Sequence, residues 1–416
     1  MTELYNIVVQ QDENTVMTRY EARPAEQTAY QSEAALEASF MTQLERQGYE
    51  RVPIHSEAEL TANLRRQLER LNHLTLSNDE WKRLFDRFIA NENLTLEDKT
   101  ERIQHDPVVS LELDNGETRN IRLLDKTDVY ANRLQVMNQY SPTGGTAKNR
   151  YDVTVLVNGL PLVHIELKRR GVQLKEAFNQ INRYGRESFW ADNGLFEYVQ
   201  LFVISNGTNT KYYANTTRYA HCQEQQRQRR GVKTQSNSFE FTSYWADAEN
   251  HVINDLRAFT ETFFARGTLL RILTRYCVFT VDKNLLAMRP YQIAATERIL
   301  QRIVYAHNKR LQGTRRAGGY IWHTTGSGKT LTSFKTAQLA SRLDFVDKVL
   351  FVVDRKDLDY QTMKEYDNFE KDAANSNSNA RILQRQLNDP NCHIIITTIQ
   401  KLSRLLSRQV ELNCLD

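Results

Sequence analysis

The 416-residue sequence predicts a mixed α/β fold in two parts. In the first part, amphipathic helical segments precede a series of short apolar segments that are typical of β-strands. In the second part, from about residue 286, helical and strand-like segments alternate, which is typical of βα units and a parallel sheet. A chain of this length exceeds one ordinary hydrophobic core, so we expect two or three domains.

The composition is that of a soluble globular protein, with 40% hydrophobic and 25% charged residues. The 55 basic and 51 acidic residues give a net charge of +4, which permits a nucleic-acid partner without requiring one. The chain has no signal-peptide pattern and no apolar segment long enough to span a membrane. We therefore expect a cytoplasmic protein with no membrane partner. The cysteines are far apart and form no C-x-x-C pair, which argues against a disulfide framework or a zinc site: Cys222, Cys277, Cys392 and Cys414.

Helices are expected at the start of the first part. The segment from about residue 29 to 47 places its apolar residues on one face, and Gly48 is suited to end it. Two more helices are expected in SEAELTANLRRQLERL and SNDEWKRLFDRFI. In the second of these, Ser77 and Glu80 have the spacing of a capping box.

Strands are expected from about Val108, in VVSLELD and NIRLLD, then around an Asn-Gly turn, and later in YVQLFVISNG. The helix KEAFNQINRYGRESF separates the last two. The basic segment from Cys222 to Ser238 could hold phosphates, but a solvated loop is the favoured interpretation. We place the first domain at residues 1–260, a linker at 261–285 and the second domain at 286–416.

Three charged residues interrupt the apolar hairpin RYDVTVLVNGLPLVHIELKRRG: Asp152, Glu166 and Lys168. Glu166 and Lys168 are two residues apart, so they share one face of a strand. Two carboxylates on neighbouring strands can hold Mg²⁺, a hard ion that prefers oxygen ligands. A nearby ammonium can stabilise the charge that develops when a phosphodiester is cleaved. The pattern predicts a nuclease site, and charge pairs on a surface strand are the alternative.

The register of this hairpin decides whether such a site can form. A simple two-residue turn at Asn158-Gly159 would pair Asp152 with Ile165 and place the two carboxylates on opposite faces. A three-residue loop, or a bulge near Pro161, would instead place Asp152 opposite Glu166. We therefore predict that the hairpin is not a simple two-residue one.

The pattern D-x13-E-x-K resembles the core of PD-(D/E)XK nucleases, here without the proline before Asp152. The next helix carries Gln180 and Tyr184, four residues apart on one face. This spacing resembles the Q-x-x-x-Y motif of RecB-type nucleases, which lies beside the metal site and contacts the substrate. The resemblance implies catalytic roles for Asp152, Glu166 and Lys168. It also implies an upstream helical acid, for which Glu37 ranks ahead of Glu33.

The second part contains GGYIWHTTGSGKTLTSFKTAQLA, in which a strand at Tyr320–Trp322, a glycine-containing loop and a helix are expected. Backbone N–H groups of such a loop surround phosphates at a helix N-terminus. Lys329 would reach the β- and γ-phosphates of ATP, and the Thr330 hydroxyl would ligate Mg²⁺. His323 stands where the strict pattern begins with glycine. The expected ATP-binding loop comprises Thr325, Gly326, Ser327, Gly328, Lys329 and Thr330.

Three neighbouring segments resemble the motor domains of superfamily-two helicases. MRPYQIAATERIL resembles the segment before the phosphate loop, where a Gln reads adenine; this implies that Gln292, with Arg289 nearby, binds ATP. KVLFVVDRKDLDYQ and CHIIITTIQKL resemble the next two motifs, which contact DNA. No Asp-Glu pair and no second motor domain follow them. We therefore expect a RecA-like domain that is incomplete at its C-terminal end, with ATP binding but not sustained hydrolysis.

Together, these segments resemble the R (restriction and translocation) subunit of type I restriction enzymes, from about residue 20 to 405. The resemblance implies a RecB-like nuclease domain followed by a RecA-like motor domain. It implies Mg²⁺-dependent cleavage of double-stranded DNA coupled to ATP-driven translocation, in a complex with methyltransferase and specificity subunits. Two alternatives are an ATP-dependent DNA helicase or remodeller whose N-terminal domain binds DNA without cutting it, and an inactive truncated assembly module.

Overall fold

The computed structural model divides into two compact units, Met1–Phe279 with Lys283–Arg289, and Thr280–Asp282 with Pro290–Asp416. It describes residues 5–11, 14–20, 32–143, 146, 149–216, 238–354, 356–369 and 379–413. Cys222, Cys414 and nearly all of the basic segment, residues 222–237, lie outside these ranges, and Cys277 and Cys392 are buried. No described helix is both long and apolar enough to cross a membrane.

The first unit is organised around a mixed sheet of eight strands in the order β12-β11-β10-β9-β8-β7-β6-β3. Strands β8 and β9 are parallel, as are β3 and β6, and the other neighbours are antiparallel. The strands are β3 (Glu50–Arg51), β6 (Leu134–Tyr140), β7 (Tyr151–Val157), β8 (Leu160–Leu167), β9 (Leu201–Ser205), β10 (Thr210–Ala214), β11 (Ser243–Ala246) and β12 (Val252–Ile253).

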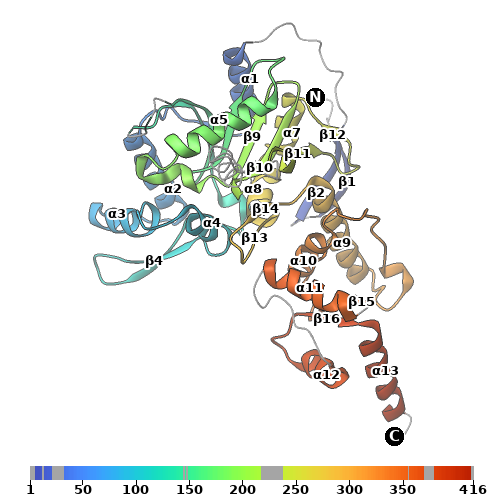
Figure 1. Cartoon of the computed structure of the whole chain (residues 1–416). Helices are drawn as coiled ribbons and strands as arrows, with labels where there is room; N and C mark the ends of the chain where they lie inside the picture. Colours follow the sequence, from blue (N-terminus) through green and yellow to red (C-terminus); the bar gives the residue numbers. More distant parts are fainter. Residues whose placement is uncertain are drawn as a thin grey trace, which may run out of the picture. The chain divides into compact units, whose positions relative to one another are not determined.

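Helices cover this sheet, and α5 packs against β8 and β9 (Figure 1). The helices of the first unit are α1 (Glu33–Arg46), α2 (Glu57–Leu71), α3 (Asn78–Leu84), α4 (Leu96–Gln104), α5 (Leu174–Glu187), α7 (Leu256–Phe263) and α8 (Arg266–Arg275). The expected capping box is confirmed, because Ser77 and Glu80 each accept a hydrogen bond from the other's backbone N–H. Gly48 follows α1 with a φ of 87°, as expected of a residue that ends a helix.

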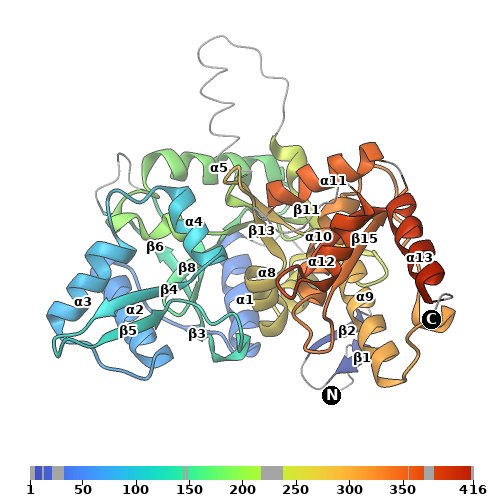
Figure 2. The ribbon, with the colours of Figure 1, turned by 90° about the horizontal axis from the view of Figure 1, so that it is seen from below.

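Three two-stranded sheets complete the strands of the first unit: β1 (Tyr5–Gln11) with β2 (Asn14–Tyr20), β4 (Val108–Glu112) with β5 (Thr118–Arg122), and β13 (Cys277–Phe279) with β14 (Leu285–Ala287). The β4–β5 hairpin packs against α2 and α3 (Figure 2). Short 3₁₀ or π-helical turns cover Phe85–Ile89, Val129–Ala131, Asp192–Tyr198, Ser238–Phe241 and Arg315–Ala317.

The predicted linker at residues 261–285 is almost entirely part of the first unit. Helix α8 buries Leu269, Leu270, Ile272 and Leu273, so this segment contributes to a hydrophobic core. The division between the units falls at residues 280–290 instead.

The hairpin of β7 and β8 combines a two-residue turn with a bulge. Val157 pairs with Leu160 across Asn158-Gly159, both with positive φ, which is the turn that an Asn-Gly pair favours. Leu156 pairs with Pro161 but Val155 pairs with Val163, so one residue, Leu162, is extra on β8. Beyond the bulge the register continues from Val153↔Ile165, which places Asp152 opposite Glu166. The predicted bulge near Pro161 is confirmed.

The second unit contains a parallel pair of strands, β15 and β16, as the alternating pattern predicts. Its elements are α9 (Pro290–Asn308), α10 (Lys329–Ala340), β15 (Val349–Val353), α11 (Lys356–Phe369), α12 (Ala380–Asn388), β16 (Ile394–Thr398) and α13 (Ile399–Asn413). The predicted strand at Tyr320–Trp322 is wrong: this segment pairs with no described strand, and Tyr320 and Trp322 are 89% and 88% exposed. A three-residue strand depends on hydrogen bonds to neighbouring strands, and here β15 pairs with β16.

We predict that Gly159→Ala lowers the free energy of unfolding by at least about 3 kcal/mol. Gly159 has a φ of 83°, and an added Cβ would lie 2.6 Å from Leu64 Cα, a backbone atom of α2. Gly116→Ala is the matched control, because Gly116 has a φ of 82° but no heavy atom within 4 Å of its Cβ position. The control should cost only about 1–2 kcal/mol in denaturant titrations. Equal losses for both variants would show that contact with α2 does not constrain the turn.

Candidate active site and phosphate loop

The hairpin brings Asp152, Glu166 and Lys168 together at one end of the sheet. The Leu167 backbone N–H donates a hydrogen bond to Asp152 Oδ2 at 2.9 Å. Lys168 Nζ donates to Glu166 Oε1 at 3.0 Å. Glu166 is completely buried, whereas Asp152 and Lys168 keep partial access to solvent. The three residues therefore meet where a solvent-accessible ligand can reach them.

Burial raises the pKa of both carboxyl groups, so they ionise less readily than exposed carboxyl groups. Desolvation and, to a lesser extent, the charge of Glu166 raise the pKa of Asp152 to about 7, against the opposing effect of the Leu167 N–H. Desolvation likewise raises the pKa of Glu166 to about 7, against the opposing charge of Lys168. Burial, the largest single effect, would lower the pKa of Lys168, but the charge and hydrogen bond of Glu166 together with the charges of Asp152 and Glu33 raise it overall. Lys168 is thus a stable positive charge beside the carboxyl pair.

One oxygen of Glu166 provides a test of whether the site fits a metal ion. Glu166 Oε2 is buried and accepts no hydrogen bond from any described residue. A buried carboxylate oxygen without a donor is costly, and a cation is a partner that would satisfy it. No group of three or more His, Cys, Asp or Glu side chains suited to a metal gathers among the described residues. Two carboxylates with open positions fit Mg²⁺, which keeps several waters, better than a closed Zn²⁺ site.

His164 is a residue of this site that the sequence patterns did not single out. It lies two residues before Glu166 on the same face of β8, is fully buried, and has Nε2 3.8 Å from Glu166 Oε2. Its Nδ1 is hydrogen-bonded to Thr154 Oγ1 at 3.1 Å. Burial lowers the pKa of His164 to about 4, so its ring is neutral at physiological pH. The period-two spacing from Glu166 is the signal that could have identified it.

Helix α5 places Gln180 and Tyr184 together, as the helical spacing predicts. Gln180 Nε2 donates a hydrogen bond to the Tyr184 hydroxyl, which donates to the Arg150 carbonyl at 3.0 Å. Burial raises the pKa of Tyr184, and the negative charges of Glu166 and Asp152 raise it further. The Tyr184 hydroxyl therefore stays protonated within electrostatic reach of both carboxyl groups.

The two acids of α1 occupy different environments. Glu37, which the sequence pattern favours, is buried and accepts hydrogen bonds from Asn138 Nδ2 at 2.6 Å and from Gln139 Nε2. Glu33 accepts a hydrogen bond from the Arg169 backbone N–H at 3.3 Å, and its charge raises the pKa of Glu166 and of Lys168. By these contacts Glu33 is the α1 carboxylate that interacts with the segment of the three charged residues, whereas Glu37 is bound by amide side chains of β6.

The phosphate loop of the second unit has the backbone that its glycines predict. Gly326 and Gly328 both have a φ of 77°, a conformation that glycine adopts without strain. Helix α10 begins at Lys329, so its free N–H groups and partial positive charge lie at the loop. Lys329 Nζ donates to the Thr324 carbonyl at 3.0 Å, which holds the ammonium against the loop. This arrangement fits the phosphates of a nucleotide. Thr325, Ser327 and Thr330 occupy the loop or the first turn of α10.

Gln292 contacts the phosphate loop itself. Its Nε2 donates to the carbonyls of Ser327 at 3.0 Å and Gly328 at 3.4 Å, and the side chain is buried. The neighbouring Tyr291 hydroxyl also donates to the Ser327 carbonyl, at 2.9 Å. The start of α9 thus supports the loop in addition to its predicted role toward adenine. Arg289 belongs to the first unit and directly precedes α9 in the chain.

Comparison with known proteins assigns both halves of the chain to described families. The family profile "Type I restriction enzyme R protein N terminus" matches residues 30–221, and the profile "SWI2/SNF2 ATPase" matches residues 291–415. The matched regions contain the residues predicted for nuclease activity and, apart from Arg289, those predicted for ATP binding.

Curated relatives agree with these matches. The type I restriction enzyme EcoprrI endonuclease subunit of Escherichia coli is 48% identical over 233 residues, which cover 56% of this chain and 69% of that protein. The SauMSSORF170P endonuclease subunit of Staphylococcus aureus is 42% identical over 293 residues, or 70% of this chain. This chain spans only 28% of the length of the staphylococcal relative. A putative MpnIIP endonuclease subunit, C-terminal part, of Mycoplasma pneumoniae is 47% identical over 172 residues, which cover 83% of that protein.

We predict that Asp152→Asn raises the melting temperature at pH 8, without divalent metal, by at least about 5 °C. The folded-state pKa of Asp152 is raised to about 7 from an ordinary value of 3.8, so ionising this carboxyl group destabilises the fold. The penalty is absent below about pH 4, where both states are protonated, and grows as the pH rises toward 8. The two proteins should therefore melt together near pH 4. A variant that is equally or less stable than the parent at pH 8 would contradict the buried, desolvated position of Asp152.

Proposed function

The chain belongs to the family of type I restriction enzyme endonuclease (R) subunits, as an N-terminal portion, and we propose that its first unit cleaves double-stranded DNA with Mg²⁺. The observation that carries this proposal is the pairing of Asp152 with Glu166 across the bulged hairpin, with Lys168 bonded to the second carboxylate. Carboxylate pairs with an adjacent ammonium suit phosphodiester cleavage, since both the metal and the developing charge need partners.

Asp152 and Glu166 would hold Mg²⁺, which when bound supplies Lewis-acid activation of the phosphodiester and of the attacking water. Lys168 keeps its positive charge at neutral pH, because the raised pKa lies further from that range than the ordinary value. Its ammonium stabilises negative charge on the cleaved phosphate. Glu166 is oriented by Lys168, and Asp152 is oriented by the Leu167 N–H, so neither carboxylate must reorganise when substrate binds.

Gln180 and Tyr184 would position the substrate strand beside the metal ligands. The Tyr184 hydroxyl accepts from Gln180 and donates to the Arg150 carbonyl, so these two bonds hold the Gln180 amide in place. The second N–H of the Gln180 amide would donate to a phosphate or sugar oxygen, which accepts hydrogen bonds. Glu33 and Glu37 would act from α1, Glu33 through its charge on Glu166 and Glu37 through the Asn138 and Gln139 amides.

The second unit would bind ATP with Mg²⁺ and form part of a RecA-like DNA motor. Its support is the loop from Thr325 to Thr330 at the start of α10 and the match to an ATPase family. Lys329 would contact the β- and γ-phosphates, Thr330 would ligate the Mg²⁺ that accompanies ATP, and Gln292 with Arg289 would serve the adenine side. In the full-length subunit this motor would move double-stranded DNA toward the nuclease. The methyltransferase and specificity subunits would be its partners, in the cytoplasm, where free cysteines stay reduced.

Asp152→Ala should reduce Mg²⁺-dependent DNA cleavage by the full restriction complex by at least about 100-fold. The physical reason is the loss of one of two metal-holding carboxylates. ATP hydrolysis by the same complex should be retained, because Asp152 and the phosphate loop lie in different units. Asp106→Ala is the matched control, since Asp106 is an exposed acid of the same unit, and it should cleave at the parental rate. Cleavage that survives Asp152→Ala would leave DNA binding without catalysis as the function of this unit.

Lys329→Ala should weaken Mg²⁺-ATP binding by about tenfold or more, because a charged hydrogen bond to phosphate is lost. The measurement is titration of the full-length chain with a fluorescent ATP analogue. Lys309→Ala, at an exposed lysine of the second unit, serves as the control and should bind normally. Unchanged affinity in the Lys329 variant would show that this loop does not hold the nucleotide.

A further inference from the structure

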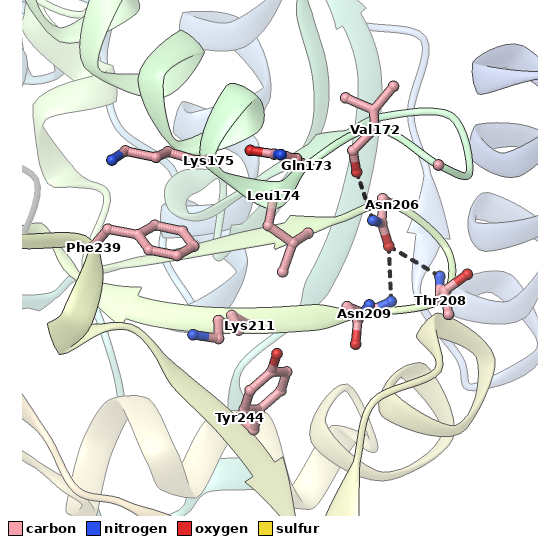
Figure 3. Close-up of a pocket in the computed structure, with 11 residues that line it drawn as sticks. Val172, Gln173, Leu174, Lys175, Asn206, Thr208, Asn209, Lys211, Phe239 and Tyr244 are labelled. Atoms are coloured by element: carbon pink, nitrogen blue, oxygen red, sulfur yellow. Dashed lines mark hydrogen bonds between the residues drawn. The ribbon is translucent and has the colours of Figure 1, made fainter.

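A pocket of about 560 Å³ lies beside the candidate nuclease site and takes no part in the chemistry described above. It is formed by the chain after β8, the first turn of α5, the turn between β9 and β10, and residues at β10 and β11 (Figure 3). Its lining residues are Gly171, Val172, Gln173, Leu174, Lys175, Asn206, Thr208, Asn209, Lys211, Phe239 and Tyr244.

The pocket adjoins the same strand ends that carry Glu166 and Lys168. Strands β8 and β9 are parallel, and Gly171 and Asn206 follow their carboxyl ends. The Lys168 backbone N–H donates to the Ser205 carbonyl at 2.8 Å, which ties the catalytic segment to the pocket turn. Ligands of sheets with parallel strands commonly bind at this end. A ligand that occupied both places would therefore pass from the carboxylates into the pocket.

Charge in the pocket favours an anion. Lys175 and Lys211 line it, and none of its described lining residues carries a carboxylate. The side chain of Arg170 packs against Gly207 in the same turn, within 3.4 Å of the Cβ position there. Figure 3 shows the ammonium ends of Lys175 and Lys211 on the same side of the pocket as Phe239. The first turn of α5 adds backbone N–H groups, because no described side chain caps this helix at Gln173.

Aromatic rings surround one of these cations. Lys211 Nζ lies 4.9 Å from the ring centre of Phe239 and 4.6 Å from that of Tyr244, and it donates to Thr242 Oγ1 at 3.1 Å. Burial lowers the pKa of Lys211, so its ammonium is short of water and would gain from an anionic partner. The Phe239 ring is held edge-on against Phe178 at 5.4 Å, and Tyr244 is 38% exposed.

A phosphate beside a planar ring is the chemistry that these groups recognise together. Ammonium groups bind phosphate, and exposed aromatic rings stack on nucleobases. The turn between β9 and β10 is rigid, since Asn206 Nδ2 donates to the Val172 carbonyl while Asn206 Oδ1 accepts from Thr208 N and Asn209 N. This side of the pocket is therefore already formed before a ligand binds.

We propose that this pocket binds one nucleotide of the DNA strand next to the cleaved phosphodiester, with its phosphate between Lys175 and Lys211 and its base against Tyr244. The proposal rests on the proposed function, because the strand assignment assumes that DNA reaches Asp152 and Glu166. A free nucleotide offers the same chemistry, and the experiment separates the two sources.

The test is DNA binding by the full-length chain in EDTA, where no cleavage occurs, followed by fluorescence anisotropy of a labelled duplex with a single-stranded overhang. Lys175→Ala combined with Lys211→Ala should weaken binding about tenfold and reduce its salt dependence. Tyr244→Leu should weaken binding about fivefold or more, and Tyr244→Phe should restore it, because phenylalanine keeps the stacking ring. Lys82→Ala, at an exposed lysine on α3, should bind like the parent.

The single variant Lys175→Ala tests the pocket without risk of misfolding, because Lys175 is exposed and is not needed to pack the core. Parental affinity in all pocket variants would overturn the proposal, while the loss of cleavage in Asp152→Ala would still uphold the nuclease assignment. Deoxyadenosine monophosphate that binds in a Lys211-dependent manner, with oligonucleotide binding unaffected by the variants, would overturn the strand assignment in favour of a free nucleotide. Inorganic phosphate as competitor should displace DNA only weakly, since it lacks a base.

Discussion

The first unit depends on one electrostatic constraint: two carboxyl groups face each other on buried neighbouring strands. Desolvation raises the pKa of Asp152 and of Glu166 to about 7, so water no longer supplies the stabilisation that ordinary carboxylates have. Neighbouring residues partly replace the lost hydration. Lys168 balances the charge, and His164 stays neutral behind Glu166. The bulged hairpin holds the pair in place, anchored at Asn158 by hydrogen bonds to the Leu123 carbonyl and Asn132. Such an arrangement is costly to stability, which is typical of residues kept for function.

Much of this site could be predicted from the sequence, because spacing along strands and helices decides which side chains share a face. The bulge follows from requiring Asp152 to face Glu166, and the contact of Gln180 with Tyr184 follows from helical periodicity. The period-two spacing from Glu166 places His164 on the same strand face, but spacing alone does not separate a site histidine from one that packs in the core between apolar neighbours. The choice between Glu33 and Glu37 depends on where β6 places Asn138 and Gln139, residues that are distant in sequence.

In the fold as well, features set by nearby residues can be predicted from the sequence, whereas features that depend on distant residues cannot. Helix α1, the capping box of α3 and the glycine-rich loop before α10 are set by nearby residues, and each agrees with its prediction. The segment Tyr320–Trp322 has the composition of a strand, but a strand needs partners that composition does not reveal. Helix α8 likewise joins the core of the first unit, although its amphipathic pattern does not say which core it joins.

The bulge at Leu162 determines which residues of β7 and β8 face each other. Thirteen residues separate Asp152 from Glu166. This spacing places both carboxylates on one face only because one of the thirteen, Leu162, forms the bulge. A ladder without the bulge would pair Asp152 with Ile165 and turn Glu166 to the opposite face, although the apolar pattern of β8 would still suit a strand. Deleting Leu162 would instead remove the bulge and keep the two acids opposite each other, because Glu166 would move into the register position of Ile165. The spacing of the two acids and the form of the hairpin therefore constrain each other: thirteen intervening residues require one bulge, and twelve would require none.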